Sequence, residues 1–464
     1  MSPSAITSTR VVLREGDRHV VKPACIMLNG ARIAAVLPHD EAPADALDLG
    51  DRLVAPSFID VHTHLCLHGL RGAPLEDASG TNVVEQVFFN FESRLTYDDV
   101  RAITRVGALE CLLHGTGLVW DHYYHADAIL DGLRDVGMAG VIAPALQDLF
   151  GPGVGGAEAA LDLTVDRMTA DLDHGLTTAL GPHATDTVSD ALWQTIAEAA
   201  DTHQLPIHGH IAQSIEEVER AWARAETTPL GLLDRLGVLD AAPWWNLVHG
   251  LYLSDADLTR LDPKRHHLVW CRSSQLQFGF PAHAPVWEAA GLSWSVATDC
   301  AATNDGMNVQ KELREVAGLR TSGMAWGEAH ATWRRHASLP HAQAVAEKRR
   351  RGWYGRASLG DVHRLLDRVT TFPGRLHPLL PAGQIAPGYL ANLTLFNMDH
   401  PSFWPGRDPI RALAMSDVSP AIWGMLVAGK WVSTPGAHAQ SLIEDDRWTE
   451  ARREASERLV RLLA

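Results

Sequence analysis

The chain has 464 residues, of which 46% are hydrophobic and 21% charged, as in an ordinary globular protein. Its net charge of -16, from 40 basic and 56 acidic residues, disfavours nucleic acid or an anionic membrane surface as the main partner. The five cysteines are scattered and form no CxxC pair, which excludes a disulfide framework and a cysteine zinc site as expectations.

The chain begins with a segment that predicts β-structure rather than a targeting signal. Residues 1–54 contain short apolar runs between turns, with Asn-Gly at 29–30 as a strong hairpin signal, and residues 385–435 have the same character. We expect both segments to form one small β-sandwich domain, beside a barrel over 55–384 and before a helical tail over 436–464. Neither the apolar core of a signal peptide nor a run of transmembrane length is present, which predicts a cytoplasmic protein.

The middle of the chain alternates strand-like and helix-like segments. Helical spacers such as residues 97–114 and 188–203 separate eight apolar runs. Eight βα units over about 300 residues predict an α/β protein with a (β/α)8 TIM-like barrel. The predicted strands are residues 53–64, 116–124, 139–148, 176–184, 205–212, 246–250, 266–272 and 292–299.

The carboxyl ends of these strands carry the candidate chemistry, as they do in barrel enzymes. His62 and His64 end the first predicted strand, and residues two apart in a strand point the same way. His210, His249 and Asp299 end later strands. Three imidazoles and a carboxylate at one barrel mouth suit a divalent metal such as zinc or iron(II), so the sequence predicts a metal site there.

These segments resemble a known group. The chain is similar to the amidohydrolase superfamily, in particular to its branch of cytosine, guanine and S-adenosylhomocysteine deaminases and triazine hydrolases, over nearly its whole length. "LVAPSFIDVHTHL" resembles the opening metal motif, with Ser57 where Gly is usual, and "GQIAPGYLANLTLFN" resembles the return into the small domain, with Asn392 where Asp is usual. Further similar segments are "LECLLHGTGLVWDHYYH", "LGPHATDTVSDALW", "HGLYLSDADLTRL" and "ATDCAATNDGMNVQKELR".

The resemblance implies a metal-dependent hydrolase acting on a C–N bond of a small nitrogen heterocycle, with an aminohydrolase (deaminase) that releases ammonia or an amine as the favoured activity. It also implies a homo-oligomer, most often a dimer. One divalent ion, zinc in preference to iron, would be held by His62, His64, His210 and Asp299. His249 would orient the attacking water, Asp299 would take its proton, and His183 would touch the substrate. The strand ends offer no lysine for a carbamate bridge, which favours one metal ion over two.

Two residues depart from the family pattern. Gln213 stands where these deaminases carry Glu as a proton shuttle, and Trp270 replaces a His after the seventh strand, predicting a bulkier, aromatic pocket wall. An amide does not titrate in the useful range. Either the proton transfer passes to His249, Asp299 or the extra His122, or the leaving group differs, as in ring opening of a cyclic amide or amidine; loss of activity is a third possibility. We expect Gln213, Trp270 and His122 to line the substrate pocket beside His183.

Other segments of the chain indicate different possibilities. The segment "GPGVGG" at 151–156 matches a dinucleotide-binding motif, and Asp171 follows it at about the sequence spacing expected of an acidic residue that contacts the ribose. A dinucleotide-binding oxidoreductase is therefore the rival class. Pro152 removes an N–H from that turn, and the motif opens no first βαβ unit, so we expect a mobile loop over the barrel mouth. Residues 323–358 interrupt the pattern and predict an insertion that covers the site. His208 shares the face of His210 and is expected to lie one layer deeper, in a supporting role.

Overall fold

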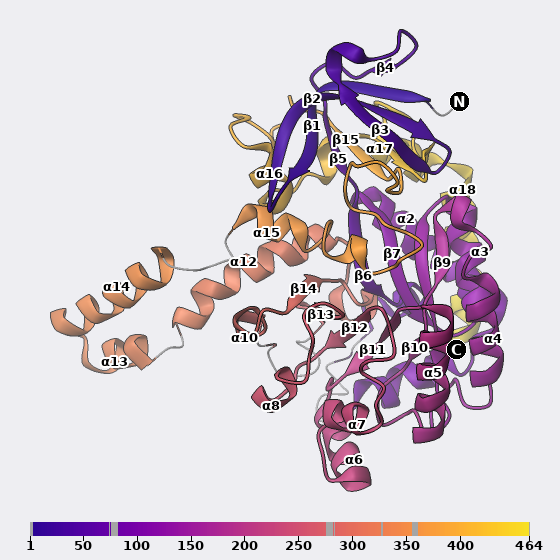
Figure 1. Ribbon diagram of the computed structural model, residues 1–464, viewed down its shortest axis with the longest axis vertical. Helices are drawn as coiled ribbons and strands as arrows, with labels where there is room; N and C mark the ends of the chain where they lie inside the picture. The colour runs from indigo at the N-terminus through magenta and orange to yellow at the C-terminus, as the bar shows by residue number, and fades with distance from the viewer. Residues whose placement is uncertain are drawn as a thin grey trace.

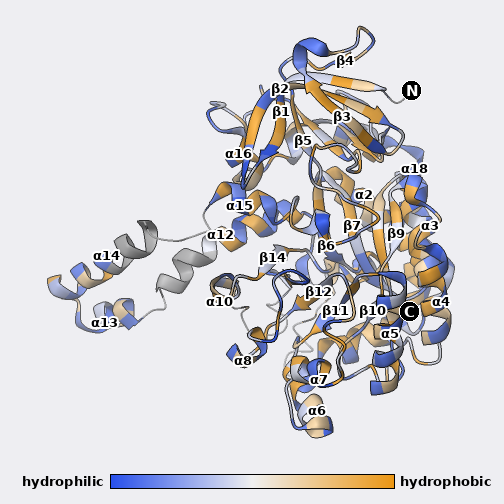
Figure 2. Cartoon of the chain, in the orientation of Figure 1, coloured by the Kyte–Doolittle hydropathy of each residue, from blue (hydrophilic) through white to orange (hydrophobic). Residues whose placement is uncertain are grey.

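The computed structural model describes residues 3–73, 75, 82–274, 282, 284–325, 328–354 and 361–463. Figure 1 shows a β-sheet unit at the top, formed by the two ends of the chain, above a barrel of strands surrounded by helices. Figure 2 shows hydrophobic residues along barrel strands such as β7 and β9, while the outer helices mix both kinds. None of the helices in the described ranges is long and apolar enough to cross a membrane.

The barrel contains all eight predicted strand segments. Two parallel sheets form its wall, and parallel bridges join them at Thr63–Asp299 and at Leu180–Ile207. The wall therefore closes, as the sequence predicted. Its strands are β6 (Phe58–Thr63), β7 (Thr116–Tyr123), β8 (Ala139–Leu146), β9 (Leu176–Thr178) with β10 (Gly181–Pro182), β11 (Ile207–Ile211), β12 (Trp245–His249), β13 (His266–Trp270) and β14 (Ser293–Val296).

The seam between β6 and β14 lies beside the predicted metal ligands. The Asp299 N–H donates to the His62 carbonyl (3.1 Å), and the His64 N–H donates to the Asp299 carbonyl (2.7 Å). One layer below, the buried Asp60 carboxylate accepts from the Thr298 N–H (3.1 Å) and hydroxyl (2.6 Å). Barrel closure and placement of the site residues thus depend on the same hydrogen bonds.

Helices cover the outside of the barrel. Among them is α2 (Tyr97–Leu113), whose start is fixed by a capping box between Thr96 and Asp99. The C-terminal α18 (Asp446–Leu463) packs on α2, and its Arg461 reaches the same Asp99. The other covering helices are α3 (Ala126–Val136), α4 (Ala157–Arg167), α5 (Asp190–His203), α6 (Ile215–Ala225), α7 (Pro229–Arg235), α10 (Ala284–Ala289), α12 (Val309–Ala325) and α15 (Val362–Asp367).

The two ends of the chain share one eight-stranded sheet. Its strands are β1 (Ala5–Glu15), β2 (Arg18–Asn29), β3 (Arg32–Pro38), β4 (Leu47–Asp48), β5 (Leu53–Pro56), β15 (Leu393–Phe396), β16 (Ile422–Val427) and β17 (Lys430–Trp431). β5 pairs with β15 in antiparallel register, which joins the N-terminal and C-terminal strands. Because β6 begins two residues after β5 ends, the sheet leads directly into the barrel. The domain boundaries at 54, 384 and 435 stay a prediction.

Asn392 ties this sheet to the barrel. Its side-chain nitrogen donates to the Gly117 carbonyl (2.8 Å), and its side-chain oxygen accepts from the Ala428 N–H (2.8 Å). An ionised Asp only accepts hydrogen bonds. Asn at this position therefore supplies a donor that the usual family residue lacks.

The predicted insertion is helical where the structure describes it, and its two described helices lie away from the barrel mouth. α13 (Glu328–His336) and α14 (Leu339–Tyr354) contact each other and extend away from the barrel in Figure 1. No described residue of either helix lines the cavities at the histidine cluster. The expectation that residues 323–358 cover the site gains no support from the described part of this segment, in which no residue of α13 is buried; residues 326–327 and 355–358 lie outside the described residues.

Candidate metal and substrate site

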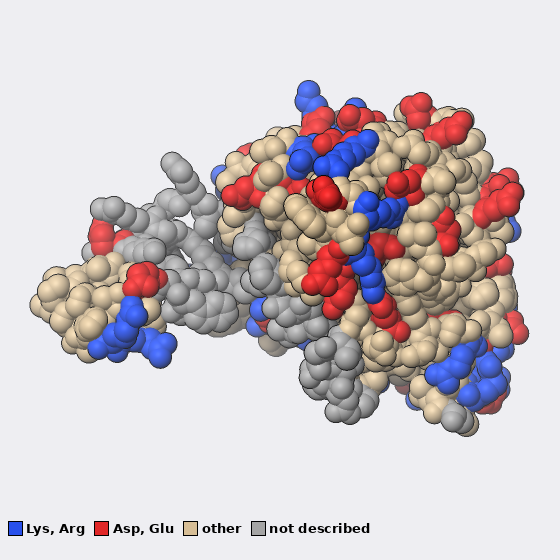
Figure 3. Space-filling model, turned by 90° about the horizontal axis from the view of Figure 1, so that it is seen from below, with Lys and Arg blue, Asp and Glu red and all other residues tan. Residues whose placement is uncertain are grey.

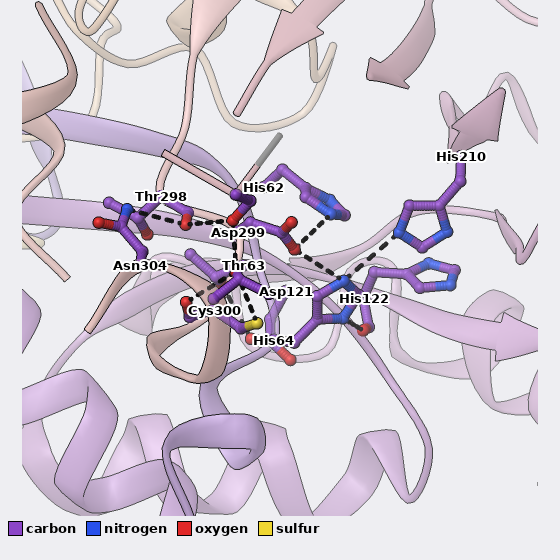
Figure 4. Close-up of polar contacts among 12 residues, drawn as sticks. His62, Thr63, His64, Asp121, His122, His210, Thr298, Asp299, Cys300 and Asn304 are labelled. Carbon is purple, nitrogen blue, oxygen red and sulfur yellow. Dashed lines mark hydrogen bonds and ion pairs between the residues drawn. The ribbon is translucent and has the colours of Figure 1, made fainter. Parts of the chain in front are cut away.

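Four of the predicted ligands converge at the carboxyl end of the barrel (Figure 4). Nε2 of His64 lies 3.3 Å from Oδ1 of Asp299 and 3.4 Å from Nε2 of His210. Nε2 of His62 lies 3.5 Å from the same Asp299 oxygen. His249 joins from β12: it offers a nitrogen within 4.8 Å of ligand atoms of His62 and Asp299. This spacing is small enough for one cation to contact several of these atoms together.

Hydrogen bonds at the far side of two rings orient their lone pairs. Nδ1 of His64 donates to the His122 carbonyl (2.5 Å), and Nδ1 of His210 donates to the His183 carbonyl (2.7 Å). Each bond places the ring proton on Nδ1 and leaves the Nε2 lone pair facing the shared centre. Imidazoles that bind metals are oriented by bonds of this kind.

A buried chain of polar groups supports His62. Nδ1 of His62 lies 2.9 Å from Nε2 of His208, whose Nδ1 lies 2.7 Å from the amide nitrogen of Asn246. In this arrangement the donors run from Asn246 through His208 to His62. If the Asn246 amide is turned over, its oxygen and nitrogen exchange places and its 3.2 Å hydrogen bond to the Val61 carbonyl is lost. The donors then run from His62 through His208 to Asn246, so the His62 proton lies on Nδ1 and Nε2 is free to bind a cation.

Burial keeps the imidazoles of His62, His210 and His249 neutral. Burial, reinforced by the neighbouring imidazoles, holds the pKa of His62 and of His210 well below the usual histidine value. Burial also lowers the pKa of His249 to about 4, although the Asp299 charge opposes that shift. Neutral imidazoles offer lone pairs, so the donor set of three to four nitrogens and one carboxylate fits a divalent cation.

The backbone is strained where two of these residues sit. His249 has φ of 73° and Asp299 has φ of 65°, both in the left-handed region that side chains with a Cβ rarely adopt. Such conformations cost about 1–3 kcal/mol each and persist where the surroundings enforce them. At Asp299 the bonds to His62 and His64 across the seam supply that constraint.

A cavity beside the cluster contains two of the predicted substrate residues. His183 and Gln213 line it together with His64, His210 and Asp299. The His183 ring lies against Phe89, with 5.6 Å between centroids, and both residues also line the outer part of the mouth. The structure therefore brings His183 and Gln213 next to the candidate metal ligands.

The other two predicted substrate residues lie deeper. His122 is buried with its ring 5.0 Å from that of His210, and it lines neither described cavity at the cluster. Trp270 is buried against Trp294, with 5.7 Å between centroids, and likewise lines neither cavity. Trp270 lies among the side chains packed outside the barrel wall.

Two buried carboxyl groups near the cavity were missed from the sequence. Glu92 lines the cavity with the metal cluster, and burial raises its pKa to about 8. Glu217 accepts from the Gln213 N–H (2.8 Å) and the Thr185 hydroxyl (2.7 Å), and burial raises its pKa to about 7. The one sequence feature that could have indicated Glu92 is the position of an acidic residue within the otherwise aromatic segment "VFFNFE".

The rival dinucleotide motif has a different role. Residues 151–156 follow β8, the third strand of a closed barrel, so they open no nucleotide-binding βαβ unit. The side-chain oxygen of Gln147 accepts from the Gly153 N–H (3.0 Å) and from the Tyr124 hydroxyl (2.9 Å). The turn is therefore hydrogen-bonded to Gln147, directly after β8, and it lines a cavity of about 380 Å³ beside Tyr123 and Tyr124.

Comparison with known proteins identifies the family. The model of the amidohydrolase family matches residues 53–432. The chain belongs to the amidohydrolase family. It is 28% identical over 437 residues to a 5-methylthioadenosine/S-adenosylhomocysteine deaminase of Nitratidesulfovibrio vulgaris, covering 92% of this chain and 91% of that relative. A 5'-deoxyadenosine deaminase of Methanothrix thermoacetophila is 26% identical over 332 residues, or 70% of this chain and 77% of that relative.

Solved structures share the fold. An adenosine deaminase from Xanthomonas campestris with bound zinc superimposes with a TM-score of 0.79 at 22% identity, covering 98% of both chains. An atrazine chlorohydrolase from Arthrobacter aurescens, complexed with zinc, gives 0.75 at 19% identity, covering 99% of this chain and 100% of that one. These findings confirm the predicted barrel and family. This amidohydrolase is a metal-dependent hydrolase acting on C–N bonds, as the sequence predicted.

Proposed function

We propose that this amidohydrolase is an aminohydrolase that releases ammonia from the amino-substituted ring of an adenine-type nucleoside, using one zinc ion. The observation that carries the proposal is the convergence of neutral imidazoles and one carboxylate at the carboxyl end of the barrel. The relatives named 5-methylthioadenosine/S-adenosylhomocysteine deaminase and 5'-deoxyadenosine deaminase support the substrate class. The zinc named with the similar adenosine deaminase structure supports the choice of metal.

In this proposal metal binding, proton transfer and orientation of the attacking water fall to different residues. His62, His64, His210 and Asp299 hold the ion. A bound divalent ion lowers the pKa of water toward neutrality and so provides hydroxide for attack on the ring carbon. The Asp299 carboxylate accepts the proton that water loses and carries it toward the departing amine. His249 donates a hydrogen bond to the attacking oxygen and orients it, while the electron pair of the attacked C=N bond moves to the ring nitrogen, which accepts a hydrogen bond from the Gln213 amide.

Gln213, His183 and the deeper His122 and Trp270 complete the proposed pocket. The Gln213 amide and the His183 ring bind the ring nitrogens and edge substituents of the substrate, because both line the cavity at the cluster. His122 holds His64 through its carbonyl, and Trp270 shapes the wall from behind. Gln213 cannot relay protons as a carboxyl group can, so Asp299 and His249 perform the acid–base steps.

Gln213 also supports a second candidate function. A substrate with a better leaving group, or a cyclic amide or amidine that opens on hydrolysis, needs less proton transfer to the departing atom. Atrazine chlorohydrolase is among the similar structures, although its low identity shows the fold alone. Hydrolysis with a different leaving group is therefore the alternative that the substrate screen must include.

The test is a screen of amine release by the zinc-loaded enzyme. Ammonia is measured with adenosine, 5'-deoxyadenosine, 5'-methylthioadenosine, S-adenosylhomocysteine, guanine and cytosine, and the ring products with atrazine. The proposal predicts ammonia from at least one adenine nucleoside, and none from the His64→Ala variant. Turnover of atrazine alone would favour the second candidate, and no turnover of any compound would contradict both.

Gln213→Ala separates substrate binding from acid–base catalysis. We expect it mainly to raise KM, while His249→Ala and Asp299→Ala lower kcat by about 10²–10⁴-fold, the usual contribution of acid–base groups. Gln213→Ala with unchanged KM and kcat would remove this residue from the proposed pocket. Gln213→Glu serves as the matched variant, because it restores a titrating group without changing side-chain length.

We also propose that the enzyme is a homodimer, as the resemblance suggests, and that it acts in the cytoplasm. Light scattering during gel filtration measures the mass of the particle directly. The single-chain mass is 50.6 kDa, so a particle of that mass would contradict the dimer. Fractionation of cells that express the natural gene tests the compartment.

A further inference from the structure

A further cavity lies at the amino-terminal end of the barrel, opposite the metal cluster. It measures about 490 Å³, which is within the usual size of ligand sites. The turn at 291–293 borders it where β14 begins, whereas Asp299 follows the other end of the same strand. Its charged lining residues are Arg364, Arg368, Arg375 and Glu288.

Arg368 and Glu288 largely neutralise each other. The Arg368 side chain is 2% exposed, forms an ion pair with Glu288 and donates to the Trp294 carbonyl (3.2 Å). Its guanidinium stacks 3.3 Å above the Trp294 ring. Burial lowers the pKa of Arg368 to about 10, so it stays charged at neutral pH. Its Nε has no hydrogen-bond partner among the described residues.

Arg364 and Arg375 bring further positive charge to the cavity; of the described carboxylates, Asp367 acts on Arg375 through its charge, and the nearby Arg14 opposes that effect. Their guanidinium carbons lie 5.8 Å and 5.4 Å from the centre of the Phe372 ring, and Arg375 also lies 5.0 Å from that of Trp244. Neither side chain hydrogen-bonds or ion-pairs with a residue in the described ranges. The nearby Asp367 is buried and already bonded to Arg14 and to His19 (2.9 Å).

The cavity is therefore a concentrated positive site in a chain of net charge -16. Figure 3 shows the molecule from below, where the described basic side chains lie interspersed with acidic ones. Three arginines against one glutamate leave an excess of two positive charges around the cavity. Guanidinium groups held on aromatic rings lose little freedom when they bind a ligand, and their planar forks match phosphate oxygens.

We propose that this cavity binds a small dianionic phosphate, inorganic phosphate or a phosphate monoester, at a site separate from the active site. The excess of two charges matches a phosphate dianion, and two arginines at the rim reach its oxygens with paired N–H groups. Phe372, the one aromatic residue among the described lining residues, is only 8% exposed and has both guanidinium carbons within 5.8 Å of its ring centre, so it offers little surface on which a base could stack. The phosphate group itself is therefore the recognised feature.

The test is calorimetric titration of the full zinc-loaded chain with inorganic phosphate and, separately, glycerol 3-phosphate. We expect saturable binding at one site per chain, which weakens with salt. Arg364→Gln and Arg375→Gln should each weaken it at least tenfold, and the double variant should abolish it. The variants lose only the contacts of these guanidiniums with Phe372 and Trp244, so they should stay folded with at most a small decrease in melting temperature.

Arg452→Gln is the matched control. Arg452 is exposed on α18, which packs on α2 rather than on the elements that line this cavity, and its substitution removes the same charge from the protein. We expect it to leave phosphate binding unchanged. Phosphate held only by the active-site metal would bind equally well to the Arg364→Gln/Arg375→Gln double variant. That result, or no saturable binding of either phosphate compound at millimolar concentration, would overturn the proposal.

Discussion

Replacing His208 with Phe should weaken zinc binding although His208 is not a proposed ligand. The substitution removes the 2.9 Å contact to Nδ1 of His62 and the 2.7 Å contact to Asn246. Phe keeps the ring that packs against Trp120, with 5.5 Å between centroids in the native chain. The variant therefore removes polar contacts while it preserves most of the packing.

The expected magnitude follows from the buried position of this contact. His62 is fully buried, so its Nδ1 loses its partner without gaining water. An unsatisfied buried group costs about 1–3 kcal/mol, which corresponds to about 5–150-fold in affinity. Residues that orient metal-binding histidines typically contribute about 10–100-fold. We therefore expect the zinc dissociation constant to rise by one to two orders of magnitude.

Competition with a chelator of known zinc affinity measures this effect. His267→Phe is the matched control, because His267 is also buried on a barrel strand and also has two polar contacts, to Ser293 and Ser295 at 2.8 Å each. It should lower the melting temperature but leave zinc affinity at the wild-type value. Equal zinc affinity in wild type and His208→Phe, or equal weakening in both variants, would refute the reasoning.

Three further outcomes are expected. Gly209→Ala should lower the melting temperature and the zinc affinity together, since its Cβ would lie 2.3 Å from the Pro182 carbonyl oxygen and overpacking costs about 1–3 kcal/mol; a normal melting curve would contradict this. His377 is buried with its pKa lowered to about 4, so the unfolded chain binds the extra proton between pH 6.5 and 4 and stability falls as pH falls through that window. His377→Leu should flatten that part of the profile of melting temperature against pH, and an unchanged slope would contradict the assignment. Gln213→Glu should raise kcat on adenine nucleosides if proton transfer limits the rate, whereas a lower kcat would show that the amide itself binds the substrate.

The barrel could be predicted because its strands are apolar runs with helical segments between them. His62 and His64 could be placed together because side chains in a strand alternate, and the carboxyl ends of parallel strands meet. The positions of His210, His249 and Asp299 follow from the same two rules. The structure brings these residues into the predicted arrangement.

Other features depend on contacts that chain order does not reveal. Barrel strands are buried on both faces, so alternation could not decide whether Trp270 points into the mouth or outward to Trp294. The support of His62 by Asn246 joins strands far apart in sequence. The arginine cavity likewise combines Glu288 with residues about 80 positions later, which no local pattern predicts.

The metal content of the purified chain tests the central claim most directly. Elemental analysis of the wild-type protein and of His64→Ala, both dialysed against the same zinc buffer, gives zinc equivalents per chain. The account predicts one equivalent in the wild type and almost none in His64→Ala. One full equivalent retained by His64→Ala, or no tightly held metal in the wild type, would contradict it.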